Sequence, residues 1–74
     1  MNIIRFVKNN NVTFARLRHD VAYYNVKDTE SNETFQFPVP LSDIGTATLE
    51  ATEKAMLFMR YIRKAIAENT FMKI

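Results

Sequence analysis

The hydrophobic period of the chain changes once, and this change is the feature that most constrains the fold. In the first half, apolar and polar side chains alternate, as in VTFARLR and TFQFPVP. In the last third, apolar side chains return every three or four positions. Alternation is typical of strands with one buried face, and the longer period is typical of an amphipathic helix. We therefore predict an α+β fold: a small antiparallel sheet (three to four strands, a meander) followed by one long C-terminal helix packed on its inner face.

Turn-forming residues divide the first half into strands, which we predict at residues 2–7, 12–18, 21–26 and 34–40. The asparagines of 8–11 tolerate positive φ, and His19-Asp20 has the length of a tight hairpin turn. The polar segment 28–33 is predicted to be a loop. Pro38 and Pro40 have no N–H for a ladder, so the last of these strands should lie at an edge or end there.

The two predicted hairpins fix a register. Closing them at His19-Asp20 and near Glu30-Ser31 places the same residues on one face, as a single buried side requires. The expected pairs are Leu17 with Ala22, Ala15 with Tyr24, Thr13 with Val26, Val26 with Phe35, Tyr24 with Phe37, and Ala22 with Val39. The inner face then holds the residues of these pairs, with Ile4 and Phe6. The outer face holds Phe14, Arg16, Arg18, Tyr23, Asn25 and Gln36, with Arg5.

The helix is predicted to begin near a cap at Thr46 or Thr48 and to end around Asn69. Ser42 or Asp43 would cap a short turn before it. At about 100° per residue, its buried face should comprise Ala51, Ala55, Phe58, Met59, Ile62 and Ile66, extended backwards by Ile44 and Ala47. The final residues 71–74 would add a short strand beside the first.

Length and composition favour a single domain, residues 1–74, that folds around its own core. Of the 74 residues, 47% are hydrophobic, and none is cysteine, which fits a reducing compartment. No apolar run approaches the ~18 residues of a membrane span, and the apolar start is too short for a signal peptide. We expect a cytoplasmic protein without a membrane partner.

Residues that could carry catalysis or hold a metal are few and scattered. His19 is the only histidine and Gly45 the only glycine, so neither a triad nor a glycine-rich phosphate loop is indicated. Asp28, Glu30 and Glu33 lack the spacing of a calcium loop. We expect no enzymatic activity, no metal, no cofactor and no small-molecule substrate.

Two surfaces remain as candidate binding sites. Arginine and aromatic residues suit both protein interfaces and nucleic acids, and they occur on both surfaces. On the outer face of the helix we predict a partner-binding patch of Met56, Leu57, Arg60, Tyr61 and Lys64, with Leu57 and Tyr61 exposed in the monomer. On the sheet the alternative binding face comprises Arg5, Phe14, Arg16, Arg18 and Tyr23.

These features favour a small non-enzymatic binding protein that regulates or inhibits a protein partner, such as an accessory protein of a bacterium or phage, or that pairs with itself as a homodimer. Nucleic-acid binding by the outer sheet face is the alternative.

Residues 28–53 carry six acidic and no basic residues between two basic ends. Basic ends could bind nucleic acid, but acids near the start of a helix and bases near its end also complement its dipole, and we prefer this structural explanation of the charge pattern. The layout of YYNVKDTESNETFQF before a helix, across residues 21–66, resembles the sheet-first DNA-binding domains of tyrosine recombinases, which place a three-stranded sheet in the major groove. That resemblance implies the alternative.

Overall fold

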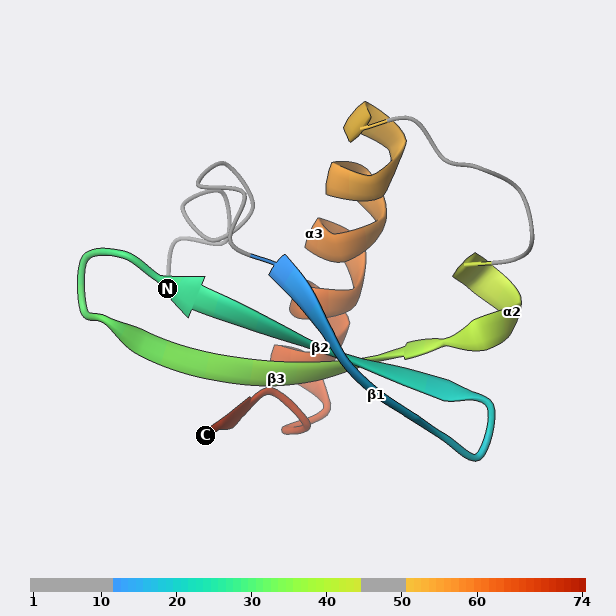
Figure 1. The fold of residues 1–74 in the computed structure, drawn as a ribbon, viewed down its shortest axis with the longest axis horizontal. Helices are drawn as coiled ribbons and strands as arrows, with labels where there is room; N and C mark the ends of the chain where they lie inside the picture. The colour runs from blue at the N-terminus through green and yellow to red at the C-terminus, as the bar shows by residue number, and fades with distance from the viewer. Residues whose placement is uncertain (1–11, 45–50) are drawn as a thin grey trace.

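The computed structural model describes residues 12–44 and 51–74. In chain order they form β1 (Val12–Arg18), β2 (Val21–Asp28), β3 (Glu33–Pro40), α2 (Leu41–Ile44), α3 (Ala51–Ala67) and β4 (Met72–Lys73) (Figure 1). The strands make one antiparallel sheet in the order β1-β2-β3-β4. The predicted α+β class, a meander sheet followed by a C-terminal helix, is confirmed. The predicted strand 2–7, the turn 8–11 and the caps Thr46 and Thr48 lie outside the described residues.

The first hairpin turns at His19-Asp20, as predicted. Both residues have positive φ angles, 51° and 60°. Two consecutive residues of this kind define the type I′ turn, whose twist matches that of the flanking strands. Asp20 also anchors the end of β3, because its carbonyl oxygen accepts a hydrogen bond of 2.9 Å from the N–H of Leu41.

The pairing of β1 with β2 follows the predicted register only next to the turn. Leu17 pairs with Ala22, but a bulge between Phe14 and Arg16 shifts the register, so that Phe14 instead of Ala15 pairs with Tyr24. A bulge adds one residue to one strand and reverses the faces of everything beyond it. The prediction that Phe14 belongs to the outer face is therefore wrong. Its ring meets the edge of the Tyr24 ring at 5.8 Å between centroids, although 59% of the residue stays exposed.

The pairing of β2 with β3 is confirmed over its whole length. Val26 pairs with Phe35, Tyr24 with Phe37, and Ala22 with Val39. The strands are longer than predicted and enclose a loop of residues 29–32. Asp28, which is 2% exposed, stabilises this loop: its carboxylate accepts hydrogen bonds from the Glu30 N–H at 3.1 Å and the Ser31 hydroxyl at 3.0 Å. This acidic segment is thus a hairpin loop.

The end of α3 is set by Asn69, close to where the sequence placed it. Asn69 adopts a left-handed φ of 61°. The N–H of Thr70 then donates to the carbonyl oxygen of Ala65 at 2.7 Å, and the N–H of Asn69 to that of Ile66 at 3.3 Å. These two bonds form a Schellman motif, which satisfies carbonyls at the end of the helix. The chain then enters β4, which pairs with β3 at Phe35 and Gln36; the strand 2–7, beside which it was expected, lies outside the described residues.

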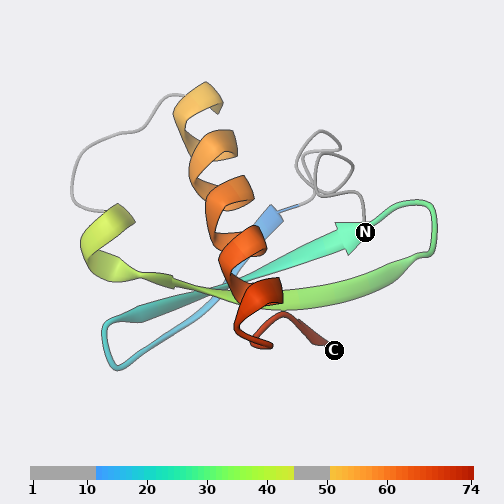
Figure 2. The same ribbon diagram turned by 180° about the vertical axis from the view of Figure 1, so that it is seen from behind.

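Helix α3 meets the sheet with its C-terminal turns, while its N-terminal turns project away from the sheet in both views (Figures 1 and 2). The core cluster joins three sheet residues, Val26, Phe37 and Val39, to three helix residues, Tyr61, Ile62 and Ala65. Next to this cluster, the Phe58 ring lies 4.9 Å from that of Tyr24 and 6.0 Å from that of Phe37, measured between centroids.

The buried face of α3 is rotated about the helix axis from the predicted face by less than about 100°, the angle between neighbouring residues of a helix. Ile62 and Phe58 belong to it as predicted, but Ile66 is 38% exposed and Met59 is only half-buried outside the core cluster. Tyr61 and Ala65 take their place. Apolar residues lie on both sides of the predicted buried face, so periodicity alone did not determine how the helix is rotated about its axis. The aromatic contacts of Phe58 and the turn into β4 determine it.

Neither helix in the described part of the chain is long and apolar enough to cross a membrane.

Candidate binding surfaces

Tyr61 was predicted to be an exposed partner-binding residue, and this prediction is wrong. Only 4% of Tyr61 is exposed. The Arg60 guanidinium lies 5.6 Å and the Lys64 amine 5.8 Å from the centre of its ring, so two basic side chains cover the tyrosine. Their stems shield apolar surface while the charged heads remain in water, which explains how a tyrosine with polar neighbours in sequence becomes buried. Leu57 is half-buried and packs against the core cluster, so its predicted exposure is not seen either.

The predicted helix patch keeps Met56, Arg60 and Lys64 in exposed positions. Met56 is 67% exposed. It lies in a shallow hollow of about 490 Å³ that contains two further apolar and three charged residues. We call this hollow the α3 outer surface; the described residues that line it are Glu53, Met56, Leu57, Met59, Arg60 and Arg63. Every one of them comes from a single helix, so the described chain forms an open surface there and not an enclosed cleft.

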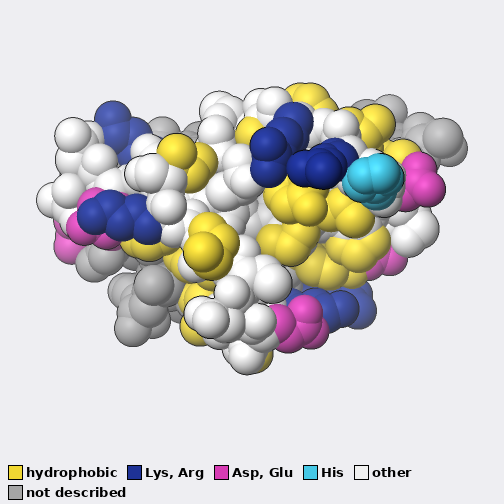
Figure 3. All heavy atoms as spheres, turned by 90° about the horizontal axis from the view of Figure 1, so that it is seen from below, with side chains coloured by type: hydrophobic (Ala, Val, Ile, Leu, Met, Phe, Trp, Pro, Cys, Tyr) yellow, Lys and Arg dark blue, Asp and Glu magenta, His cyan; other side chains and the backbone are white. Residues whose placement is uncertain are grey.

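The outer face of the sheet keeps Arg16, Arg18 and Tyr23 of the predicted alternative site. The Arg16 guanidinium lies 5.0 Å from the centre of the Tyr23 ring, a cation–π contact across the β1–β2 pair. Figure 3 views the molecule from below and shows a contiguous apolar area whose border carries Lys and Arg, His, and Asp or Glu side chains. Phe14 has moved to the other face, and Arg5 lies outside the described residues.

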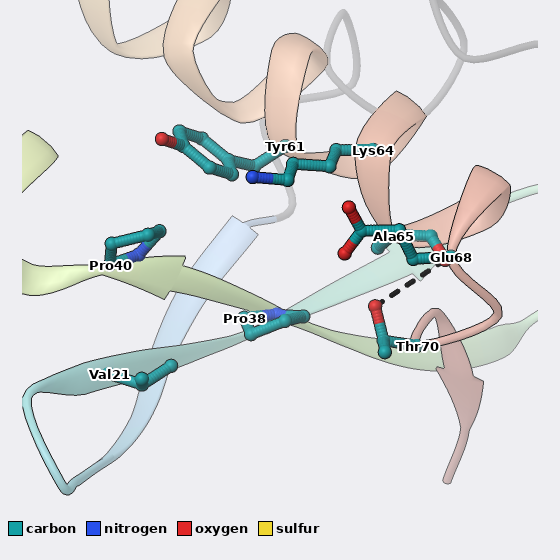
Figure 4. A pocket seen from close by; sticks show the side chains of 8 residues that line it. All are labelled: Val21, Pro38, Pro40, Tyr61, Lys64, Ala65, Glu68 and Thr70. Atoms are coloured by element: carbon teal, nitrogen blue, oxygen red, sulfur yellow. Dashed lines mark hydrogen bonds between the residues drawn. The ribbon is translucent and has the colours of Figure 1, made fainter.

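A second hollow lies between the end of β3 and the C-terminal half of α3, and we call it the edge hollow (Figure 4). Its volume is about 130 Å³. The lining residues are Val21, Pro38 and Pro40 from the sheet, Tyr61, Lys64, Ala65 and Glu68 from α3, and Thr70 from the turn that follows. In Figure 4 the Glu68 carboxylate points into the space between helix and strand, and the Thr70 hydroxyl is engaged with the Ala65 carbonyl oxygen at 3.5 Å.

The sequence did not indicate the edge hollow as a site. Pro38 and Pro40 were interpreted only as signals of a strand edge, and no role was predicted for Glu68. The available signal was the spacing of Tyr61, Lys64, Ala65 and Glu68, which places all four on one side of a helix. What the sequence could not supply was the position of that side next to the prolines, which depends on the rotation of α3.

The histidine and the acidic side chains of the described residues do not gather in one place. Among residues 12–44 and 51–74, no group of three or more His, Cys, Asp or Glu side chains could hold a metal ion. His19 is exposed at the tip of the first hairpin. Comparison with family models, with curated proteins and with solved structures found no match to this chain.

Proposed function

We propose that this chain is a small non-enzymatic binding protein of the cytoplasm that regulates or inhibits an acidic protein partner through the α3 outer surface. The single observation that carries the proposal is Met56, an apolar side chain that is 67% exposed inside a hollow bordered by Arg60 and Arg63. An exposed apolar residue within a polar rim is a feature of contact sites.

The charge of the surface supports the choice of partner. Arg60 and Arg63 line the hollow, and Lys64 is exposed beside them, against one acidic residue, Glu53. A rim of one sign attracts a partner of the opposite sign and orients it during encounter. The apolar side chains of Met56, Leu57 and Met59 would contribute the area that is removed from water, because methionine adapts its shape to a partner surface.

Nucleic-acid binding by the outer sheet face remains the second candidate, on one specific observation. Arg16 and Arg18 lie two positions apart on β1, and Arg16 covers the ring of Tyr23. Arginine beside an aromatic ring suits phosphate contacts and base stacking. In this case affinity for an oligonucleotide would fall by roughly one log unit per log unit of salt for each phosphate contacted.

The test compares two variants that alter surface charge and should both keep the wild-type fold. Met56→Ser with Arg63→Glu changes the α3 outer surface without touching a buried residue, and Arg18→Glu is the control on the sheet. Wild type and control, immobilised and exposed to lysate of the native host, should retain the same acidic protein. The α3 variant should lose at least tenfold of this binding with an unchanged melting temperature, since interface centres concentrate binding energy.

Two results would contradict the proposal. One is equal retention of the acidic protein by wild type and the α3 variant. The other is salt-sensitive binding of an oligonucleotide, measured by fluorescence anisotropy, that Arg18→Glu abolishes and the α3 variant preserves; the sheet would then be the functional surface.

A further inference from the structure

We propose that the α3 outer surface is complementary to itself, so that two copies of the chain pair through antiparallel α3 helices and the acidic partner competes with this dimer. The inference rests on the proposed function for the identity of the surface, and it adds a second copy as the occupant when the partner is absent. Three observations support it: the spacing of the lining residues, the order of their charges, and the side of the helix on which they lie.

The lining residues of the α3 outer surface are arranged symmetrically about Phe58. They form three pairs whose members lie equally far before and after that position: Glu53 with Arg63, Met56 with Arg60, and Leu57 with Met59. A twofold axis between two antiparallel helices places each residue of one copy at the level of its pair in the other, and a twofold interface requires such a self-complementary set. In chain order, the first two pairs also follow the spacing of three, four and three residues found along a seam between two helices.

The charged residues at the two ends of the surface have opposite signs. Glu53 and Arg63 lie about 15 Å apart along the helix, and both are exposed. Neither belongs to an ion pair within the described part of the chain. Antiparallel pairing brings Glu53 of each copy opposite Arg63 of the other and makes two ion pairs. Parallel pairing would align like charges, so the charges select the antiparallel arrangement.

The centre of the surface is apolar. Met56 is 67% exposed, and Leu57 and Met59 are half-buried on either side of it. The Arg60 guanidinium lies over the Tyr61 ring, 5.6 Å from its centre, and Tyr61 is about 140° around the helix from Met56. The charge of Arg60 is therefore held beside Tyr61, away from Met56. Pairing would remove three apolar side chains of each copy from water between the two ion pairs.

The surface lies on the side of α3 that faces away from the sheet. Met56 and the core residue Ala65 are about 180° apart around the helix. The N-terminal turns of α3 also project away from the sheet in both ribbon views, so the described sheet does not obstruct a second helix (Figures 1 and 2). One face of one helix is small for an interface, and we expect a weak dimer with a dissociation constant on the order of 0.1–1 mM.

The experiment uses the purified chain alone, measured by sedimentation equilibrium up to millimolar concentration. The wild type should show a monomer–dimer equilibrium without larger species. Glu53→Arg and Arg63→Glu should each weaken the dimer about tenfold, because each places like charges at both ends of the interface. An equimolar mixture of these two variants should restore association as a heterodimer, since opposite charges then meet at both ends. Lys54→Glu, on the same helix outside the surface, is the matched control and should change nothing.

Glu53→Arg also separates the dimer from the proposed function, because it disrupts pairing but makes the surface more basic. It should retain the acidic protein of the capture experiment at least as well as the wild type. A wild type that stays monomeric at millimolar concentration, or a mixture of the two variants that associates no better than either alone, would overturn the self-pairing. Loss of both the dimer and the acidic protein in Glu53→Arg would overturn the competition, since the partner would then bind the dimer.

Discussion

At the scale of single residues, the first hairpin turn carries local strain that a substitution can relieve. His19 and Asp20 have φ angles of 51° and 60°, and neither is glycine. A left-handed conformation costs most residues about 1–2 kcal/mol, less for asparagine and least for glycine. His19→Asn with Asp20→Gly creates the favoured type I′ sequence. We expect it to raise the free energy of unfolding by about 1 kcal/mol, measured by urea denaturation with an unchanged m-value.

The control for this variant is His19→Val, because a β-branched residue tolerates positive φ poorly. It should lower the free energy of unfolding by about 1 kcal/mol or more. A stabilising effect of valine, or a destabilising effect of Asn-Gly, would mean that a side-chain contact of His19 outweighs its backbone geometry.

At the scale of elements, Pro38 and Pro40 lie in a stretch of the β3 edge that β4 does not cover in the described part of the chain, and we expect them to protect it. Pro38→Thr with Pro40→Thr restores two N–H groups on a stretch of edge with which β4 does not pair. Exposed, complete edges recruit further strands. We therefore expect this variant to self-associate in a concentration-dependent manner, measured by sedimentation velocity. The wild type should not associate in this way at the same concentrations.

Lysine at the same two positions separates the backbone effect from the loss of the proline rings. Pro38→Lys with Pro40→Lys also restores the N–H groups, but charged side chains at an edge oppose strand addition. This variant should not associate. If both variants associate equally, or if neither does, the prolines have no protective role.

The elements also show where the sequence was sufficient and where it was not. The β2–β3 register was predictable because alternation in both strands and a polar loop agree on one pairing, such as Tyr24 with Phe37. The bulge near Ala15 left no such signal, and it moved Phe14 to the other face. The predicted rotation of α3 about its axis was wrong for a related reason. Tyr61 and Ile66 lie on opposite sides of the same apolar stripe of the helix, and only contacts with residues distant in sequence determine which of the two is buried.

The predictions of the candidate sites depended on the same distinction between local pattern and distant contacts. Exposed positions such as Met56 and Arg16 were predictable because no other face could accommodate them. The edge hollow was not, since Pro40 and Glu68 meet only after the helix has taken its final rotation and the chain has turned back into β4. The local sequence pattern thus predicted the helices and strands and most of the strand pairing. Tertiary contacts determined which polar groups face one another.

At the scale of the whole molecule, helix and sheet share one core cluster, so neither should persist alone. Ile62 is fully buried in that cluster, and Ile66, one turn later on the same helix, is 38% exposed. Ile62→Ala should lower the free energy of unfolding by about 2–5 kcal/mol, a large part of the stability of so small a domain. Ile66→Ala removes the same atoms from a site open to water and should cost less than about 1 kcal/mol.

Loss of Ile62 should affect both layers at once. Helix content followed by circular dichroism and the amide signals of β2 and β3 followed by NMR should disappear at the same urea concentration, as a single cooperative transition requires. Separate midpoints would mean that the sheet is stable without α3. Equal costs for the two alanine substitutions would mean that Ile66 is buried in solution, and that the buried face of α3 is the one expected from periodicity.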